Sequence, residues 1–300
     1  MENLLKILFK PDNIPIVILT VLVVFFFGLF VYKARRNDKQ ELPEEAKLDD
    51  KVQVWPYLVR LEFLMTIAIM AILVVWSITI NAPLEEAANP ALTPNPSKAP
   101  WYFLGLQEML VYFDPWIAGV LLPSLIIVGL MAIPYLDINE TGNGYYTFKE
   151  RRFAVTVFCF GFLVLWVTLI FLGTFFRGPG WNFFWPWEYW DVHKVVVLNN
   201  VDLSEYLGMP TRLPDNSLNP MAFIFGGLVF FGFYSIGVLF YFRNRKKDWM
   251  QKLGVVRYAI IAYLLLSMGG LVIKILLRII PPFFGLNPVK YIWVTPWFNV

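Results

Sequence analysis

Six long apolar runs constrain the fold of this chain more than any other feature of its sequence. A helix needs about 20 apolar residues to cross a bilayer, because about 30 Å of hydrocarbon must be covered at 1.5 Å per residue. Six stretches in the 300-residue chain are long enough: residues 14–32, 61–80, 116–136, 153–176, 221–242 and 258–280. The sequence therefore predicts an all-α membrane protein with about six transmembrane helices, the first of them a retained anchor rather than a cleaved signal peptide.

The distribution of basic residues predicts the orientation of these helices. Fifteen lysines and arginines lie in the connections on one side, and eight lie in the longer connections on the other side. Positively charged loops stay on the inner side of a membrane. We therefore expect both termini, and the connection after the second run, on the outer side.

The composition excludes several classes of protein. Only 16% of the residues are charged and the net charge is +3, which gives no basis for a nucleic-acid partner. The chain has one cysteine, Cys159, and one histidine, His193. This supply excludes a disulfide framework, a Cys-rich metal site and covalent haem attachment, so no metal site is expected. We interpret His193 as a surface histidine.

The connection at residues 81–115 is rich in prolines and aromatic residues. Prolines recur at positions 83, 90, 94, 96 and 100. Each proline fixes its own φ and disfavours helix in the residue before it, which predicts an extended path. From Pro100 onward, "WYFLGLQEMLVYF" predicts a short surface helix with the proline in its first turn. Asp114, followed by Pro115, is then expected to cap the next transmembrane helix.

Two interpretations fit this short helix. Trp101 and Glu108 are seven residues apart, close to two helical turns, so they are expected to share a face, with Tyr102 beside them. An aromatic wall with one carboxylate at the edge of the hydrocarbon suits a redox-active phenol such as a quinol, whose hydroxyl proton the carboxylate accepts. The plainer alternative, a surface helix with aromatic anchors and an exposed glutamate, is favoured by composition alone.

A longer motif adds to the first interpretation. The stretch "PNPSKAPWYFLGLQEML", with "NAPLEEAANPALT" before it and "DPWIAGVLLPSLI" after it, resembles the quinol-oxidation loop of the cytochrome b family. It is most similar to the separate C-terminal half, or subunit IV, of bacterial quinol:cytochrome c oxidoreductases of the bc and bf kind. The likeness covers residues 61–176. It implies a subunit of a respiratory or photosynthetic complex that helps to form the outer-face quinol-oxidation site and couples electron transfer to proton release.

The resemblance also implies site residues, with one departure from the family pattern. Relatives carry Pro-Glu-Trp-Tyr, and its glutamate accepts a proton from quinol, whereas this chain has Pro100 at the glutamate position. Glu108 is the first candidate to replace that glutamate and Asp114 the second. By the same resemblance, the quinol-binding residues are expected to be Pro100, Trp101, Tyr102 and Leu106.

The resemblance places the redox cofactors on other chains. Haem b and an iron–sulfur cluster are expected on partner subunits: an N-terminal dihaem cytochrome b subunit, a Rieske iron–sulfur protein and a c-type cytochrome, in a dimeric complex of the bacterial inner membrane. This chain is expected to bind quinol or quinone at the subunit interface and to ligate no metal. The alternative is a non-catalytic scaffold subunit with a degenerate quinone site. A transporter is disfavoured, because the apolar runs contain almost no ionisable residues.

The remaining segments give the expected domain organisation. Residues 1–35 form the anchor helix, 36–57 a charged cytoplasmic linker, and 58–177 the helices of the resemblance with the quinol loop at 81–115. Residues 178–220 form an aromatic outer loop whose "WNFFWPWEYW" is expected at the membrane boundary, and 221–300 add two transmembrane helices and an outer tail. Lys274 and Arg278, four residues apart near an outer end, are expected to bind lipid headgroups.

Overall fold

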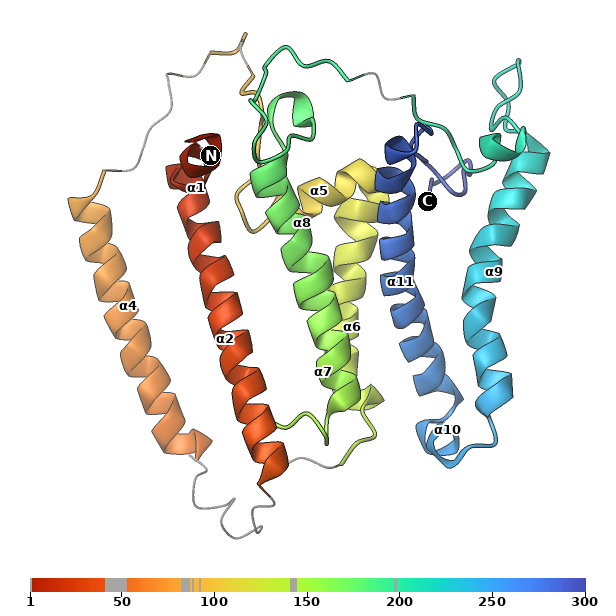
Figure 1. Ribbon diagram of the computed structural model, residues 1–300. Helices are drawn as coiled ribbons and strands as arrows, with labels where there is room; N and C mark the ends of the chain where they lie inside the picture. Colours follow the sequence, from red (N-terminus) through yellow and green to blue (C-terminus); the bar gives the residue numbers. More distant parts are fainter. Residues whose placement is uncertain are drawn as a thin grey trace. The chain divides into compact units, whose positions relative to one another are not determined.

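The computed structural model is helical and describes residues 2–40, 53–81, 87, 89–91, 93–140, 145–196 and 199–300. Within these residues, six helices are long and apolar enough to cross a membrane: Ile14–Lys39, Val54–Thr79, Ile117–Leu136, Arg152–Phe176, Pro220–Asn244 and Val255–Pro282 (Figure 1). Each coincides with one of the six apolar runs, which confirms the predicted all-α membrane fold. Extended pairing in the described part of the chain is limited to isolated bridges.

The chain divides into two compact units, which are described separately. The first unit consists of Met1–Ile7, Asn95–Asn139 and Thr156–Val300, and the second of Leu8–Pro94 and Glu140–Val155. The candidate site lies entirely in the first unit. Residues 41–52 of the expected charged linker lie outside the described residues.

The second unit contains α2 (Ile14–Lys39) and α4 (Val59–Thr79), the latter preceded by the π-helical turn η2 (Val54–Leu58). The C-terminal end of α2 is tied to the segment before α7: the Asn37 side chain donates to the carbonyl of Tyr146 at 3.0 Å, and the Asp38 carboxylate accepts from the backbone N–H of Phe148 at 3.2 Å. No residue of α4 is buried within the described chain.

The first unit holds the other spans, apart from residues 152–155, which belong to the second unit. One begins with the π-helical turn η3 (Ile117–Leu121) and continues as α6 (Leu122–Leu136). The next runs through α7 (Arg152–Cys159), η4 (Phe160–Val167), α8 (Thr168–Phe171) and η5 (Leu172–Phe176). The last two are α9 (Pro220–Asn244) and α11 (Val255–Phe283), joined through the short α10 (Asp248–Leu253). Shorter helices are α1 (Glu2–Leu8), η6 (Pro179–Trp181) and η7 (Glu205–Leu207).

A short helix, α5 (Leu104–Tyr112), runs crosswise to α6, α8 and α11 near one end of this unit (Figure 1). The main buried apolar cluster lies where α5 meets these helices. Its buried members are Met109, Tyr112, Phe113, Ile117, Ala118, Leu169 and Leu271. The core of the first unit is therefore concentrated around α5.

The C-terminal tail folds back over the ends of α9 and α11. Val289 forms a parallel bridge with Val201, and Val294 pairs with Asn299. Trp293 is 8% exposed and lies against α9 at Gly226, where a Cβ would lie 2.6 Å from Trp293 Cδ1. Glycine at position 226 therefore allows the tail to pack against the helix.

Candidate functional site

The segment predicted to bind quinol enters α5 through a turn. The N–H of Phe103 donates to the carbonyl of Pro100 at 2.8 Å, and the helix begins at Leu104. A short helix follows the proline-rich stretch, and it starts later than the expected first turn at Pro100. Trp101 precedes the helix, so the prediction that Trp101 and Glu108 share one helix face was wrong.

Small residues let α5 approach α8 and η5 closely. A Cβ on Gly105 would lie 3.2 Å from Ile170 Cγ1, and a Cβ on Gly173 would lie 2.8 Å from Leu104 Cδ2. Both distances are shorter than ordinary carbon–carbon contacts. This approach buries one side of α5, including Leu104 and Glu108.

The buried side of α5 carries an ion pair that the sequence interpretation missed. Glu108 is 0% exposed, and its carboxylate accepts two hydrogen bonds from the Arg177 guanidinium, Nε to Oε2 at 3.0 Å and Nη2 to Oε1 at 2.7 Å. The Tyr112 hydroxyl donates to Oε1 at 2.8 Å. The Arg177 side chain is 13% exposed, and its Nη1 donates to the carbonyl of Trp181 at 3.1 Å. The bidentate geometry is the strong form of such a pair.

Burial of the pair shifts the pKa values of Tyr112 and of Arg177 itself. Burial, and then the negative charge of Glu108, raise the pKa of the Tyr112 hydroxyl above its ordinary value. Burial opposes the charge of Arg177, but its hydrogen bonds to Glu108 and the charge of Glu108 outweigh that effect and raise the Arg177 pKa. Arg177 therefore stays charged and Tyr112 stays protonated at neutral pH.

Side chains also fasten the loop before α5. Gln107 accepts from the N–H of Ala99 at 2.7 Å and donates to the carbonyl of Ser97 at 2.9 Å. Lys98 donates to the carbonyl of Thr174 at 2.7 Å and lies 5.0 Å from the centre of the Trp190 ring. The loop is therefore held to α5, to η5 and to the outer loop that follows η5.

The predicted quinol-binding residues occupy different environments. Tyr102 is 51% exposed and Trp101 is half-buried, with their rings in edge contact at 5.7 Å. Pro100 is exposed, whereas Leu106 packs against the buried cluster. The turn thus presents two aromatic rings, and Leu106 lies on the core side.

Asp114 caps the next span, as predicted. Its Oδ1 accepts from the N–H of Trp116 at 3.1 Å, and its carbonyl accepts from the N–H of Ala118 at 2.9 Å. Its Oδ2 lies 3.5 Å from Nδ2 of Asn299 in the C-terminal tail. The side chain is half-buried, so this carboxylate is more accessible than that of Glu108.

The two residues predicted to bind lipid differ in burial. Lys274 is 1% exposed, and its Nζ donates to the carbonyl of Lys290 at 2.5 Å. It therefore lies inside the protein rather than extending to a headgroup. Arg278 is half-buried, and the prediction of lipid binding now depends on this residue.

The aromatic outer loop folds by ring stacking and turns. Trp185 and Trp187 stack at 5.2 Å, and Phe176 stacks on Phe183 at 5.4 Å. Phe184 is fully buried, and its ring lies 2.7 Å from the position of a Cβ on Gly178. The location of the aromatic outer loop at the membrane boundary stays a prediction.

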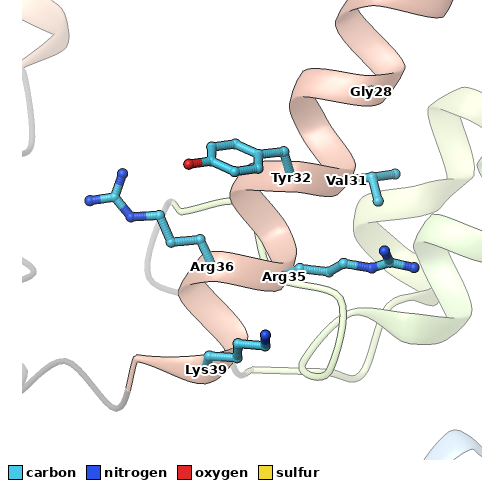
Figure 2. A pocket seen from close by; sticks show the side chains of 6 residues that line it. All are labelled: Gly28, Val31, Tyr32, Arg35, Arg36 and Lys39. Atoms are coloured by element: carbon cyan, nitrogen blue, oxygen red, sulfur yellow. The ribbon is translucent and has the colours of Figure 1, made fainter.

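A basic cavity at the end of α2 lacks convergent side chains. It has a volume of about 540 Å³ and is lined by Gly28, Val31, Tyr32, Arg35, Arg36 and Lys39, all from one helix. Figure 2 shows Arg35 and Arg36 projecting to opposite sides of that helix. These cations therefore do not form a binding site for a single anion.

Within the described residues, no group of three or more His, Cys, Asp or Glu side chains is placed to hold a metal ion. His193 is exposed, as expected of a surface histidine, and its backbone N–H donates to Asp191 at 2.9 Å.

Fold and site together define a multi-pass, all-α membrane protein with an aromatic turn fixed beside a buried ion pair. Residues 87–175 match the family model described as cytochrome b (C-terminal)/b6/petD, which confirms the resemblance seen in the sequence. This segment is similar to that family, and such a domain implies a subunit of a cytochrome bc- or b6f-type quinol oxidoreductase complex. No solved structure matches the chain. The match includes Glu108 and ends two residues before Arg177, and α4, α9 and α11 lie outside it.

Proposed function

We propose that this chain helps to form the outer-face quinol-oxidation site of a quinol:cytochrome c oxidoreductase in a bacterial inner membrane. The observation that carries the proposal is the turn at Trp101 and Tyr102. It lies within the residues matched to the family and presents partly exposed rings from a segment that Gln107 and the Glu108–Arg177 pair hold in place. A fixed aromatic wall next to apolar spans suits a lipid-soluble ring substrate.

The proposed assembly contains a dihaem cytochrome b subunit, a Rieske protein and a c-type cytochrome, and the complex is dimeric. Both termini and the quinol loop lie on the outer face. Haem b and the iron–sulfur cluster, on the partner subunits, supply the electron acceptors. The residues of this chain hold the quinol ring against Trp101 and Tyr102 and take part in releasing its protons outward.

Two carboxylates are candidates for proton acceptance, and their surroundings differ. Glu108 is enclosed by Arg177 and Tyr112, so its carboxylate would reach a substrate only if that pair opened. Asp114 is half-buried, and its Oδ2 has one long contact with Asn299. Accessibility favours Asp114 as the acceptor and Glu108 as a positioning residue for the loop.

Quinol:cytochrome c turnover of the assembled complex tests this assignment. Asp114→Asn is expected to lower kcat roughly 100-fold and to change its pH profile, because a general base contributes about 10²- to 10⁴-fold. Asp215→Asn, at an exposed carboxylate of the outer loop, is the matched control. Glu108→Gln is expected to reduce turnover together with stability. Unchanged turnover and pH profile in both Asp114→Asn and Glu108→Gln would exclude these carboxylates from proton acceptance.

The second candidate function is a non-catalytic scaffold subunit with a degenerate quinone site. The residue that favours it is Pro100, which cannot ionise where the family glutamate stands. A scaffold predicts that Trp101→Ala and Tyr102→Ala leave turnover and inhibitor sensitivity of the complex unchanged. A change in sensitivity to a quinol-site inhibitor would contradict the scaffold role.

A further inference from the structure

A second cavity lies inside the first unit, apart from the turn at Trp101. It has a volume of about 330 Å³ and is enclosed by the start of the α6 span, by α9 and α11, and by the C-terminal tail. Pockets that bind small ligands have volumes of about 300–1,000 Å³, so this space can hold one ring system. Trp101, Tyr102 and Glu108 do not line it.

The walls of this cavity are strongly aromatic. The lining includes Phe113, Trp116, Phe230, Phe233 and Tyr234. Phe230 and Tyr234 are in ring contact at 5.0 Å. Aromatic walls favour flat rings through offset or edge-on contacts, whereas an acyl chain gains no such directional contact.

One buried lysine amino group lies in the wall. Lys274 lines the cavity and is 1% exposed. A lysine amino group carries more than one N–H donor. One of them bonds to the carbonyl of Lys290 at 2.5 Å, and the group lies 5.4 Å from the centre of the Tyr291 ring. It makes no salt bridge within the described part of the chain, so a donor is left for a ligand.

Two hydroxyl groups of the wall bond to each other. The Tyr234 hydroxyl and the Ser267 hydroxyl are 3.0 Å apart, and Ser267 donates to the carbonyl of Tyr263 at 2.8 Å. Trp116 and Tyr263 also carry donors in the lining, but they are 58% and 43% exposed, so Lys274 is the buried donor of the wall that is left for a ligand. A buried phosphate would need several donors to offset its desolvation, whereas a neutral carbonyl needs one.

We propose that this cavity is a second quinone site, in which the ring of an isoprenoid quinone lies among the aromatic side chains. One ring carbonyl accepts a hydrogen bond from Nζ of Lys274, and the isoprenoid tail leaves toward lipid. The ligand class rests on the proposed function, but the site is distinct. It is built largely from α9 and α11, which lie outside the residues matched to the family.

Photolabelling of the purified complex with a photoreactive quinone analogue tests the site. Peptide mapping is expected to find label on α9, on α11 or on the tail at residues 286–300. An inhibitor of outer-face quinol oxidation should not reduce that labelling. Lys274→Met is expected to reduce it roughly tenfold, the loss typical of a buried charged hydrogen bond. An exposed lysine of α10, changed in Lys252→Met, is the control.

Two adjacent glycines of α11 provide a matched pair of filling variants. Gly270 lines the cavity, and a Cβ there would lie 3.4 Å from Phe233 Cε1, whereas a Cβ on Gly269 meets open space. Gly270→Leu is expected to abolish labelling, and Gly269→Leu to preserve it. Equal labelling of these two variants, or label confined to residues 100–112, would overturn the proposal. The proposal would also be overturned if phospholipid were the only lipid found to co-purify with a complex whose cavity is unaltered.

The same experiment separates this inference from the proposed function. Inhibitor-sensitive quinol oxidation without label on α9, α11 or the tail would overturn the second site and leave the function standing. Label at these positions in a complex that oxidises no quinol would support the second site and overturn the proposed function.

Discussion

Removal of either partner of the Glu108–Arg177 pair is expected to destabilise the protein, and removal of Arg177 is expected to cost more than removal of Glu108. Breaking a buried ion pair costs about 3–5 kcal/mol, because the remaining charge is left without compensation. Glu108 is 0% exposed and the Arg177 side chain is 13% exposed. A guanidinium left alone can reach some solvent, whereas the carboxylate left alone cannot. We therefore expect the free energy of unfolding to fall by about 4 kcal/mol in Arg177→Met. In Glu108→Gln it should fall by about 2–3 kcal/mol, because the amide still accepts one hydrogen bond.

A double-mutant cycle isolates the interaction between the two side chains. The Glu108→Gln, Arg177→Met double variant has no buried charge left uncompensated, so its loss of stability should fall short of the sum of the single variants by about 2 kcal/mol or more. The free energy of unfolding is measured by titrating the purified complex with a denaturing detergent and following ellipticity.

The pair Glu188–Lys194 provides a control within the same chain. Its side chains are 35% and 26% exposed, and exposed pairs contribute about 0–1 kcal/mol. The corresponding cycle should show coupling below about 1 kcal/mol. If the losses of unfolding free energy in the two single variants sum to that of the double variant within about 0.5 kcal/mol, the pairing is refuted. A greater loss in Glu108→Gln than in Arg177→Met would refute it too.

Further predictions concern close packing and alkaline pH. Gly173→Ala should cost about 1–3 kcal/mol, because the new Cβ would lie 2.8 Å from a side chain of α5, whereas Gly119→Ala, in open space, should cost little. Gly226→Ala should loosen the C-terminal tail and increase its proteolysis, whereas Gly232→Ala on the same helix should not. Folding raises the pKa of Tyr112 above its ordinary 10.0. The contribution of this shift to the free energy of unfolding is therefore fully present below pH 10 and is lost as the pH rises beyond it. Tyr112→Phe should therefore reduce the fall in unfolding free energy between pH 9 and 11, and an unchanged slope would contradict this.

The sequence predicted the helices because their cause is local. A run of about 20 apolar residues is excluded from water and, in lipid, must satisfy its own backbone hydrogen bonds as a helix. All six runs therefore became helices. The Asp114 cap was also predictable, since the carboxylate bonds an N–H two residues away. The start of α5 was wrong by a few residues, because the turn at Pro100 competes with the first helical turn.

The surroundings of the site residues could not be predicted in the same way. Glu108 and Arg177 are 69 positions apart, and no periodicity relates them. A basic residue directly after an apolar run is the usual sign of a helix end, so Arg177 carried no distinguishing signal. The burial of Lys274 likewise depends on a carbonyl from the tail, 16 residues further along the chain.

The sequence alone determined the number and length of the spans, the aromatic turn and the family resemblance of residues 87–175, because hydropathy, prolines and a contiguous motif are local properties. Tertiary structure alone decided which carboxylate is enclosed and which stays accessible. That outcome depends on Gly105 and Gly173, whose missing side chains let α5 approach a neighbouring span closely enough for a guanidinium to meet a buried carboxylate.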